Sequence, residues 1–229
     1  AMDNYDLRRA VEISHYDMIK DVNWYVRRGG NNHEIGRLFL ESWTYLISVS
    51  TPHLAEEWGR CLSLKEMVSA SEIKQVDSVS MDERIILDEE YIMRAVLENS
   101  RKVMTIAEKH LDGKAQKLTL IVSHEWKNQL SIAAINYLNN GGNVKQFIQE
   151  LKKMDFVNDE NMELVLSYWN KKMLSQVFKW DDKSKSLILD CIDETELLKQ
   201  RASFIAKELG LNEIEIIRAE EYQGDDGRE

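Results

Sequence analysis

"TPHLAEEW", residues Thr51 to Trp58, contains the single proline of this 229-residue chain and predicts where a helix begins. Thr51 suits the N-cap position, and Pro52 suits the first helical position, where a backbone N–H is not needed. The two glutamates that follow lie in the early turns, where acidic side chains favour a helix start. His53 and Glu57 would share one helical face, but no second cluster of histidine or cysteine completes a metal site. We therefore predict a capped helix rather than a reactive site.

The segments before this helix also have helical patterns. Apolar residues recur at three- and four-residue steps over residues 7–25, and Gly29 and Gly30 should end this first helix. A second stripe lies in residues 35–49 and comprises Ile35, Leu38, Phe39, Ser42, Leu46 and Val49. Three neighbouring helices joined by short loops predict the end of a helical bundle in residues 1–66.

The helical pattern weakens in residues 67–80, which we interpret as a connector with at most one short helix. A second domain is expected in residues 81–229. Its first element is a long helix over residues 88–111, with one side formed by Ile92, Ala95, Val96, Val103, Ile106 and His110. Residues 117–123, KLTLIVS, alternate between apolar and polar side chains and predict a strand.

The remainder of this domain is predicted to be mostly helical. The further elements are helices over residues 125–140, 144–154 and 159–177, another helix that ends at Gly210, and a strand over residues 213–219. Residues 186–194, SLILDCIDE, fit either a strand or the start of a helix. The predicted fold class is mainly α, α+β: a helical-bundle segment followed by a helix-rich domain with a small β-sheet.

Composition argues against several classes of protein. No apolar run approaches the roughly 18 residues of a membrane span, and the first residues lack the apolar segment of a signal peptide. Cys61 and Cys191 lie far apart without metal-ligand spacing, so we expect neither a disulfide framework nor a zinc site. This cysteine usage fits a reducing compartment, and we expect a cytoplasmic location. The net charge of −10 argues against a general nucleic-acid binder, and neither DNA nor a membrane is an expected partner.

Motifs for catalysis are weak. DKSKS, residues 182–186, is close to the KMSKS loop with which class I aminoacyl-tRNA synthetases hold ATP. The dinucleotide fold and the histidine motif that this loop requires are missing, so we interpret it as a solvated turn. Adjacent glutamates such as Glu56-Glu57 and Glu220-Glu221 point in different directions on a helix and are interpreted as solvated faces. No catalytic or metal-binding residue is predicted.

Local basic clusters are more informative than the total charge. The first lies between residues 101 and 127, where basic side chains outnumber acidic ones, and the second lies between residues 171 and 185. Either cluster could face RNA or serve ordinary solubility. The candidate RNA contacts are Arg101, Lys109, Lys114, Lys117, Trp126, Lys127, Lys171 and Lys172.

The stretch at residues 51–58 resembles the "aPHxaEElW" helix of the anticodon-binding helical bundle shared by class Ia aminoacyl-tRNA synthetases. Three further stretches resemble the archaeal-type leucyl-tRNA synthetases. They are YDMIKDVNWYVRR at residues 16–28, LTLIVSHEWKNQLSIA at 118–133 and ELGLNEIEIIRAEEYQGDDGRE at 208–229. The resemblance extends over most of the chain but stops before the family's basic final segment, which implies a second domain truncated at its end.

This resemblance implies the tRNA-binding C-terminal part of a leucine-tRNA ligase. The catalytic and editing domains would lie upstream, and the catalytic domain would join leucine to tRNA(Leu) with ATP and Mg²⁺, whereas this part would hold no cofactor and be inactive alone. The expected partner is tRNA(Leu), through its long variable arm rather than its anticodon. Such RNA is recognised by shape, phosphates and unstacked bases, so a few lysines and an aromatic side chain suffice. The alternatives are the corresponding end of another class Ia synthetase and a protein-interaction module without an RNA role.

Overall fold

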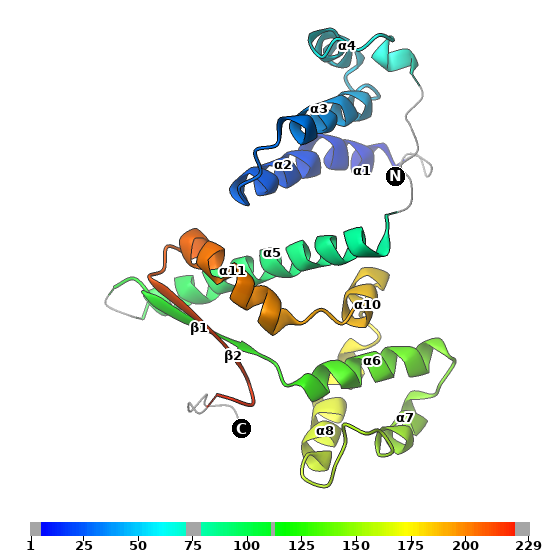
Figure 1. Cartoon of the computed structure of the whole chain (residues 1–229). Helices are drawn as coiled ribbons and strands as arrows, with labels where there is room; N and C mark the ends of the chain where they lie inside the picture. The colour runs from blue at the N-terminus through cyan, green and yellow to red at the C-terminus, as the bar shows by residue number, and fades with distance from the viewer. Residues whose placement is uncertain (1–5, 72–78, 111–112, 223–229) are drawn as a thin grey trace. The chain divides into compact units, whose positions relative to one another are not determined.

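The computed structural model describes residues 6–71, 79–110 and 113–222 (Figure 1). The chain divides into two compact units, Ala1–Ser78 and Val79–Glu229. Helices make up most of both units, and the described strands form a two-stranded sheet in the second. This confirms the predicted mainly α, α+β fold class. Within the described ranges, no helix is long and apolar enough to cross a membrane.

The first unit is built from short helices in sequence order. Its first helical region begins after Asp6, whose carboxylate accepts a hydrogen bond from the Arg9 N–H at 3.0 Å. The region ends before Gly29, whose φ of +90° confirms the predicted helix end. The elements are α1 (Leu7–Glu12), a π-helix (Ile13–Asp17), α2 (Met18–Arg27), α3 (His33–Ile47), α4 (Pro52–Cys61) and a 3-10 helix (Val68–Ala70).

Pro52 begins α4, as predicted, but the side chain of Thr51 does not cap it. The Thr51 hydroxyl donates instead to the Ile47 carbonyl oxygen at 3.1 Å. Thr51 is the N-cap residue, as predicted, but its hydroxyl is engaged elsewhere. The tight turn between α3 and α4 brings the Ile47 carbonyl oxygen, which also accepts from the Ser50 and Thr51 N–H groups, within reach of that hydroxyl. Thr51 still serves the helix through its backbone, since its carbonyl oxygen accepts from the Ala55 N–H at 3.1 Å.

The core of the first unit lies where α3, α4 and the 3-10 helix meet. Ile47, Ala55 and Val68 are buried there. Trp43 and Trp58 pack beside them with their ring centres 5.1 Å apart and nearly edge to face. The 3-10 helix within the predicted connector therefore packs against the helices before it.

The side of α3 that packs differs from the predicted stripe. Ile35 and Leu38 remain 48% and 64% exposed, so this part of the stripe is not in the core. Trp43 lies on the packed side instead, and its indole N–H donates to the Ser14 carbonyl oxygen at 2.6 Å. A large ring with a satisfied donor buries more surface than the smaller residues of the stripe, and this decides the orientation of the helix.

Glu56 was expected on a solvated face, and the structure corrects this. Its carboxylate accepts hydrogen bonds from the Val68 N–H at 3.3 Å, the Ser69 N–H at 2.8 Å and the Ser69 hydroxyl at 2.6 Å. The carboxylate thereby holds the 3-10 helix against α4. The Ser69 hydroxyl and the two backbone N–H groups lower the pKa of Glu56 below its usual range.

The second unit begins with the long helix α5 (Met81–Glu108). This helix starts before the predicted residue 88 because Ser80 and Glu83 form a capping box. The Ser80 hydroxyl accepts from the Glu83 N–H at 3.2 Å, and the Glu83 carboxylate accepts from the Ser80 N–H at 2.8 Å. The predicted end at residue 111 lies outside the described residues.

The buried side of α5 carries Ile92, Met93 and Leu97. Ile92 belongs to the predicted side, but Val103 and Ile106 are 58% and 60% exposed, so the prediction is wrong for them. The residues that pack follow a helical row that includes Met93 and Leu97, which the sequence stripe left out.

Both predicted strands are present, as β1 (Lys117–Val122) and β2 (Glu213–Arg218). They pair in parallel, with Lys117 opposite Glu213 and Val122 opposite Arg218. Both strands therefore end at the same edge, and Figure 1 shows them side by side. A parallel pair needs a long crossover, which the helices between the strands supply. The last of these, α11 (Glu194–Leu209), ends at Gly210 with φ +67°, as predicted.

The other crossover helices confirm the predicted order. They are α6 (Glu125–Asn139), α7 (Val144–Leu151), α8 (Met162–Tyr168), a π-helix (Trp169–Met173), α9 (Leu174–Gln176) and α10 (Asp182–Leu189). A buried cluster joins α6, α7, α8 and the π-helix, and it comprises Leu130, Ala134, Phe147, Leu151, Val165, Trp169, Met173 and Val177.

The ambiguous stretch at residues 186–194 contains no strand: residues 186–189 end α10, a turn follows, and Glu194 begins α11. The DKSKS stretch is therefore the start of α10 and not a solvated turn. The reason is local, because the Asp181 carboxylate accepts from the Ser184 N–H at 2.8 Å and so caps the helix.

Candidate nucleic-acid interface

A groove of about 640 Å³ lies at the carboxyl ends of β1 and β2. Val122 and Arg218, the last residues of the two strands, line it together with the first turns of α6 and α11. Loops and helix starts converge at this edge because both strands of a parallel pair end there. Three basic side chains reach the groove, from three different elements: Lys127, Lys172 and Arg218.

Lys127 is held at the groove by aromatic rings. Its ammonium lies 5.6 Å from the centre of the Trp126 ring and 5.2 Å from that of Tyr168. The two rings meet edge to face, with their centres 5.5 Å apart. Trp126 is half-buried and packs against the helical core. Because the core holds this ring in place, the ring can position Lys127.

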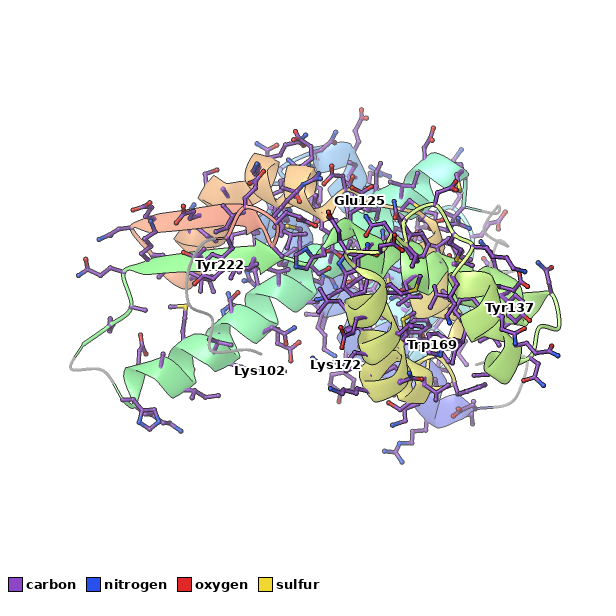
Figure 2. All side chains as sticks on the ribbon, turned by 90° about the horizontal axis from the view of Figure 1, so that it is seen from below. Lys102, Glu125, Tyr137, Trp169, Lys172 and Tyr222 are labelled. Atoms are coloured by element: carbon purple, nitrogen blue, oxygen red, sulfur yellow. The ribbon has the colours of Figure 1, made fainter. Side chains whose placement is uncertain are left out.

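Lys172 reaches the groove from the π-helix that follows α8. Trp169, in the same helix, is buried and contacts Phe147 with ring centres 4.6 Å apart. Figure 2 shows Trp169 on the side of the helix towards Tyr137 and Lys172 on the other side. Burial of the tryptophan therefore fixes the turn from which Lys172 projects.

Arg218 is paired within the groove. Its Nη2 atom lies 3.2 Å from Oδ2 of Asp193, and Oδ1 of Asp193 accepts from the Thr195 and Glu196 N–H groups at 2.9 Å and 3.1 Å. Asp193 thus caps α11 and holds the guanidinium at the same time. Glu194 also lines the groove, and loss of hydration together with the neighbouring Asp193 raises the pKa of its carboxyl.

The edge of the groove is fixed by Glu220, just after β2. Its Oε1 atom lies 3.0 Å from Nδ1 of His124 and accepts from the Glu125 N–H at 3.2 Å. Partial burial opposes its ionisation, but the backbone N–H groups and His124 outweigh this and lower the pKa of Glu220. Glu220 is exposed, as predicted, but it lies in a turn after β2 rather than on a helix and binds His124 and the Glu125 N–H.

The predicted basic cluster between residues 101 and 127 does not form one surface. Lys117 begins β1, whereas Lys127 lies beyond its end, and a six-residue strand spans about 20 Å. Lys117 also contacts Glu213 at 2.9 Å and Glu215 at 3.0 Å, and these two carboxylates raise its pKa. Its charge is largely balanced by the neighbouring strand.

The remaining predicted contacts lie away from the groove lining. Arg101 pairs with Glu208 at 3.1 Å, across α5 and α11. Lys109 and Lys114 are exposed between α5 and β1, and Lys171 is exposed on the π-helix next to Lys172. Of the eight predicted residues, the structure brings Lys127 and Lys172 together at the groove, with Trp126 behind them.

Sequence reasoning missed Arg218 and Tyr168. Arg218 ends a strand whose partner was not known, and Tyr168 looked like one more core residue of a helix. The order strand, several helices, strand was a usable signal, because it predicts parallel pairing and hence a shared edge after residues 122 and 218.

Metal ligation finds no support in the described part of the chain. No group of three or more histidine, cysteine or acidic side chains there could hold a metal ion. His53 is exposed on α4, and both Cys61 and Cys191 are free thiols.

Comparison with known proteins identifies the family. Residues 1–118 match the anticodon-binding domain of tRNA ligase, which is just over half of the chain. The chain belongs to this family. The resemblance to class Ia synthetases in residues 51–58 is thereby confirmed.

Leucine-tRNA ligases of archaea are similar to this chain over nearly all of its length. The enzyme of Methanocaldococcus jannaschii is 29% identical over 220 residues, 96% of this chain and 21% of its own. The enzyme of Methanococcus vannielii is 28% identical over 226 residues, which are 98% of this chain and 21% of its own length. The enzyme of Archaeoglobus fulgidus is 28% identical over 214 residues, which are 93% of this chain and 20% of its own length. The chain spans about a fifth of the length of these relatives.

The two comparisons cover different lengths of the chain. The family match includes the first unit, α5 and the beginning of β1. The groove residues Lys127, Lys172 and Arg218 lie beyond it, in the part that the matches to the leucine-tRNA ligases also cover.

Proposed function

We propose that this chain is the tRNA-docking C-terminal part of a leucyl-tRNA synthetase, and that the groove beyond β1 and β2 contacts the backbone of tRNA(Leu). The observation that carries the proposal is the convergence of Lys127, Lys172 and Arg218 on one groove in a chain with a net charge of −10. The similarity to archaeal leucine-tRNA ligases supports the choice of tRNA.

The groove has the chemistry that an RNA backbone requires. Phosphate oxygens bind lysine and arginine side chains, and each such contact releases counterions from the RNA. Lys127 is pre-positioned by two aromatic rings, so less of its conformational entropy is lost on binding. The acidic side chains that share the groove, Glu125, Asp193 and Glu194, lower its affinity for any polyanion, tRNA included, so binding depends on where the three cations stand and not on the summed charge of the groove.

The long variable arm of tRNA(Leu) is the proposed region of contact. A paired arm presents two phosphate backbones that can be recognised by shape. Lys171, adjacent to the groove residue Lys172, would extend the contact. Arg101 and Lys117 are weaker candidates, because each already contacts carboxylates.

Catalysis is proposed to belong to the rest of the synthetase. An upstream catalytic domain would bind ATP and Mg²⁺ and attach leucine to the tRNA, with an editing domain also upstream, while this part orients the tRNA and holds no cofactor of its own. Leucine-dependent pyrophosphate exchange by the isolated chain, above background, would contradict this division.

The proposal is tested by gel-shift titration of the chain with two RNAs across a salt series. One is tRNA(Leu), and the other is the same tRNA with its variable arm shortened to a few nucleotides. We expect tighter binding of the first and a steeper salt dependence. Equal binding of both would favour the end of another class Ia synthetase, and no binding of either would favour a protein-interaction module.

A further inference from the structure

The second unit holds a buried pair of carboxyl groups that RNA docking does not use. Asp88, on α5, is only 7% exposed, and no described residue donates a hydrogen bond to its Oδ2 atom. Asp190 directly follows α10, and its side chain is 3% exposed. The Asp190 carboxyl lies beside that of Asp88, because Asp190 is bound by Arg84, which precedes Asp88 by one turn of α5. A hydrogen bond between two carboxyl groups needs a proton on one of them, because an ionised carboxylate can only accept.

The cations near this pair already have partners. Arg84 donates to both carboxylate oxygens of Asp190, with Nε 3.0 Å from Oδ2. Lys183 lies over the ring of Tyr91, 4.3 Å from its centre. Among the described residues, the charged groups that act on Asp88 are Asp190, Arg84 and Lys183. Burial first, and then Asp190, raise the pKa of Asp88, while the two cations oppose this rise.

We propose that Asp88 and Asp190 form a proton-binding clasp between α5 and α10. With one proton shared, the hydrogen bond ties the two helices together. When the proton leaves to water, two buried negative charges face each other, and the end of α10 separates from α5. No other atom is transferred, and the reaction is the ionisation of one carboxylic acid.

The clasp is positioned to affect the groove described above. Cys191, Ile192 and Asp193 follow Asp190 without a break, and all three line the groove. Cys191 has φ +52°, a conformation that non-glycine residues rarely adopt, so the chain leaves the clasp in a constrained turn. Opening of the clasp would release this wall of the groove. Only this link to RNA binding rests on the proposed function.

The direction of the pH dependence follows from the raised pKa. The folded chain binds this proton more tightly than the unfolded chain does, so the clasp is fully effective below the ordinary aspartate pKa of 3.8. Its contribution is lost as the pH rises through the raised pKa of Asp88. Acidification from neutral pH should therefore tighten α10.

Amide hydrogen exchange of the whole chain tests the clasp without RNA. Exchange in α10 is measured from about pH 4.5 to pH 8, corrected for intrinsic rates, with α6 as the reference helix in the same unit. In the wild type, local opening of α10 should increase with pH, by up to about tenfold per pH unit while Asp88 titrates. Asp88→Asn should abolish this dependence, because the amide donates to Asp190 at every pH. Asp182→Asn, a fully exposed change on α10, should retain it.

An identical pH profile in wild type and Asp88→Asn would overturn the proposal, as would a flat profile in the wild type. Should Asp88→Asn fail to fold, carbon-13 NMR titration of the wild-type Asp88 carboxyl decides the matter. A midpoint above 3.8 is expected, and a midpoint at or below it would overturn the clasp. Neither measurement involves tRNA, so failure of the RNA-docking proposal would leave the clasp standing.

Discussion

At the scale of single residues, Asp193 sets how much positive charge the groove offers. Its Oδ2 atom holds Arg218, and a phosphate would compete for the same guanidinium. Its Oδ1 atom caps α11. Asparagine is as good an N-cap as aspartate, so Asp193→Asn would release Arg218 and keep the helix start.

We expect Asp193→Asn to raise the affinity of the chain for tRNA by up to about fivefold, because an exposed ion pair contributes roughly 0–1 kcal/mol. Filter binding at low salt measures this effect. Asp182→Asn removes the same charge outside the groove and should leave the affinity unchanged. Unchanged or weaker binding by Asp193→Asn would show that Asp193 does not compete with phosphate.

Glu56 gives a pH-dependent prediction in the first unit. Its pKa is lowered from 4.5 by the Ser69 hydroxyl and the backbone N–H groups of Ser69 and Val68. Because the pKa is lowered, the ionised Glu56 carboxylate stabilises the folded unit fully above pH 4.5, and this stabilisation is lost as the pH falls through the pKa of Glu56 in the folded chain. We expect Glu56→Gln to lower the melting temperature at neutral pH, and this difference to vanish in acid.

Thermal unfolding followed by circular dichroism at several pH values measures this difference. Glu57→Gln, a change at the exposed neighbour, is the matched control and should show little difference at any pH. A difference for Glu56→Gln that stays constant with pH would mean that its carboxylate charge is not what holds the 3-10 helix.

At the scale of elements, local sequence signals predicted most starts and ends. Gly29 and Gly210 end helices in left-handed conformations, and alternation predicted both strands. The start of α5 was missed because the capping box of Ser80 and Glu83 precedes the apolar pattern. The packed side of α3 was missed because packing of Trp43, and not the row of Ile35 and Leu38, decides it. Tertiary packing chooses between helix faces that are both partly apolar.

Packing of α4 against the 3-10 helix depends on a glycine. A Cβ on Gly59 would lie 2.6 Å from Cγ2 of the buried Val68. We expect Gly59→Ala to destabilise the first unit by about 1–3 kcal/mol despite its better helix propensity. Gly36→Ala, in α3, has no atom within 4 Å of the added Cβ and should stabilise the chain by about 0.5–1 kcal/mol. Urea unfolding measures the free energy of unfolding of both variants. Equal values would contradict the close approach of Gly59 and Val68.

At the scale of the whole molecule, the net charge does not show where the basic side chains meet. The net charge of −10 argued against a general nucleic-acid binder, yet three basic side chains meet at one groove, beside the carboxylates of Glu125, Asp193 and Glu194. Sequence clusters predicted Lys127 and Lys172 but could not predict that Lys117 faces the carboxylates of Glu213 and Glu215. Arg218 joins the site through the pairing of strands that are far apart in sequence. Such a site is set by topology, which residue spacing alone does not specify.

The most direct test of groove-mediated tRNA docking is the salt dependence of tRNA(Leu) binding by the double variant Lys127→Gln, Lys172→Gln. The matched control is Lys102→Gln, Lys153→Gln, which removes two exposed charges paired with Glu98 and Glu150 away from the groove. Loss of two phosphate contacts should weaken binding and reduce the logarithmic salt slope by roughly 2, whereas the control should keep the wild-type slope. Wild-type affinity and slope in the groove variant would contradict the account.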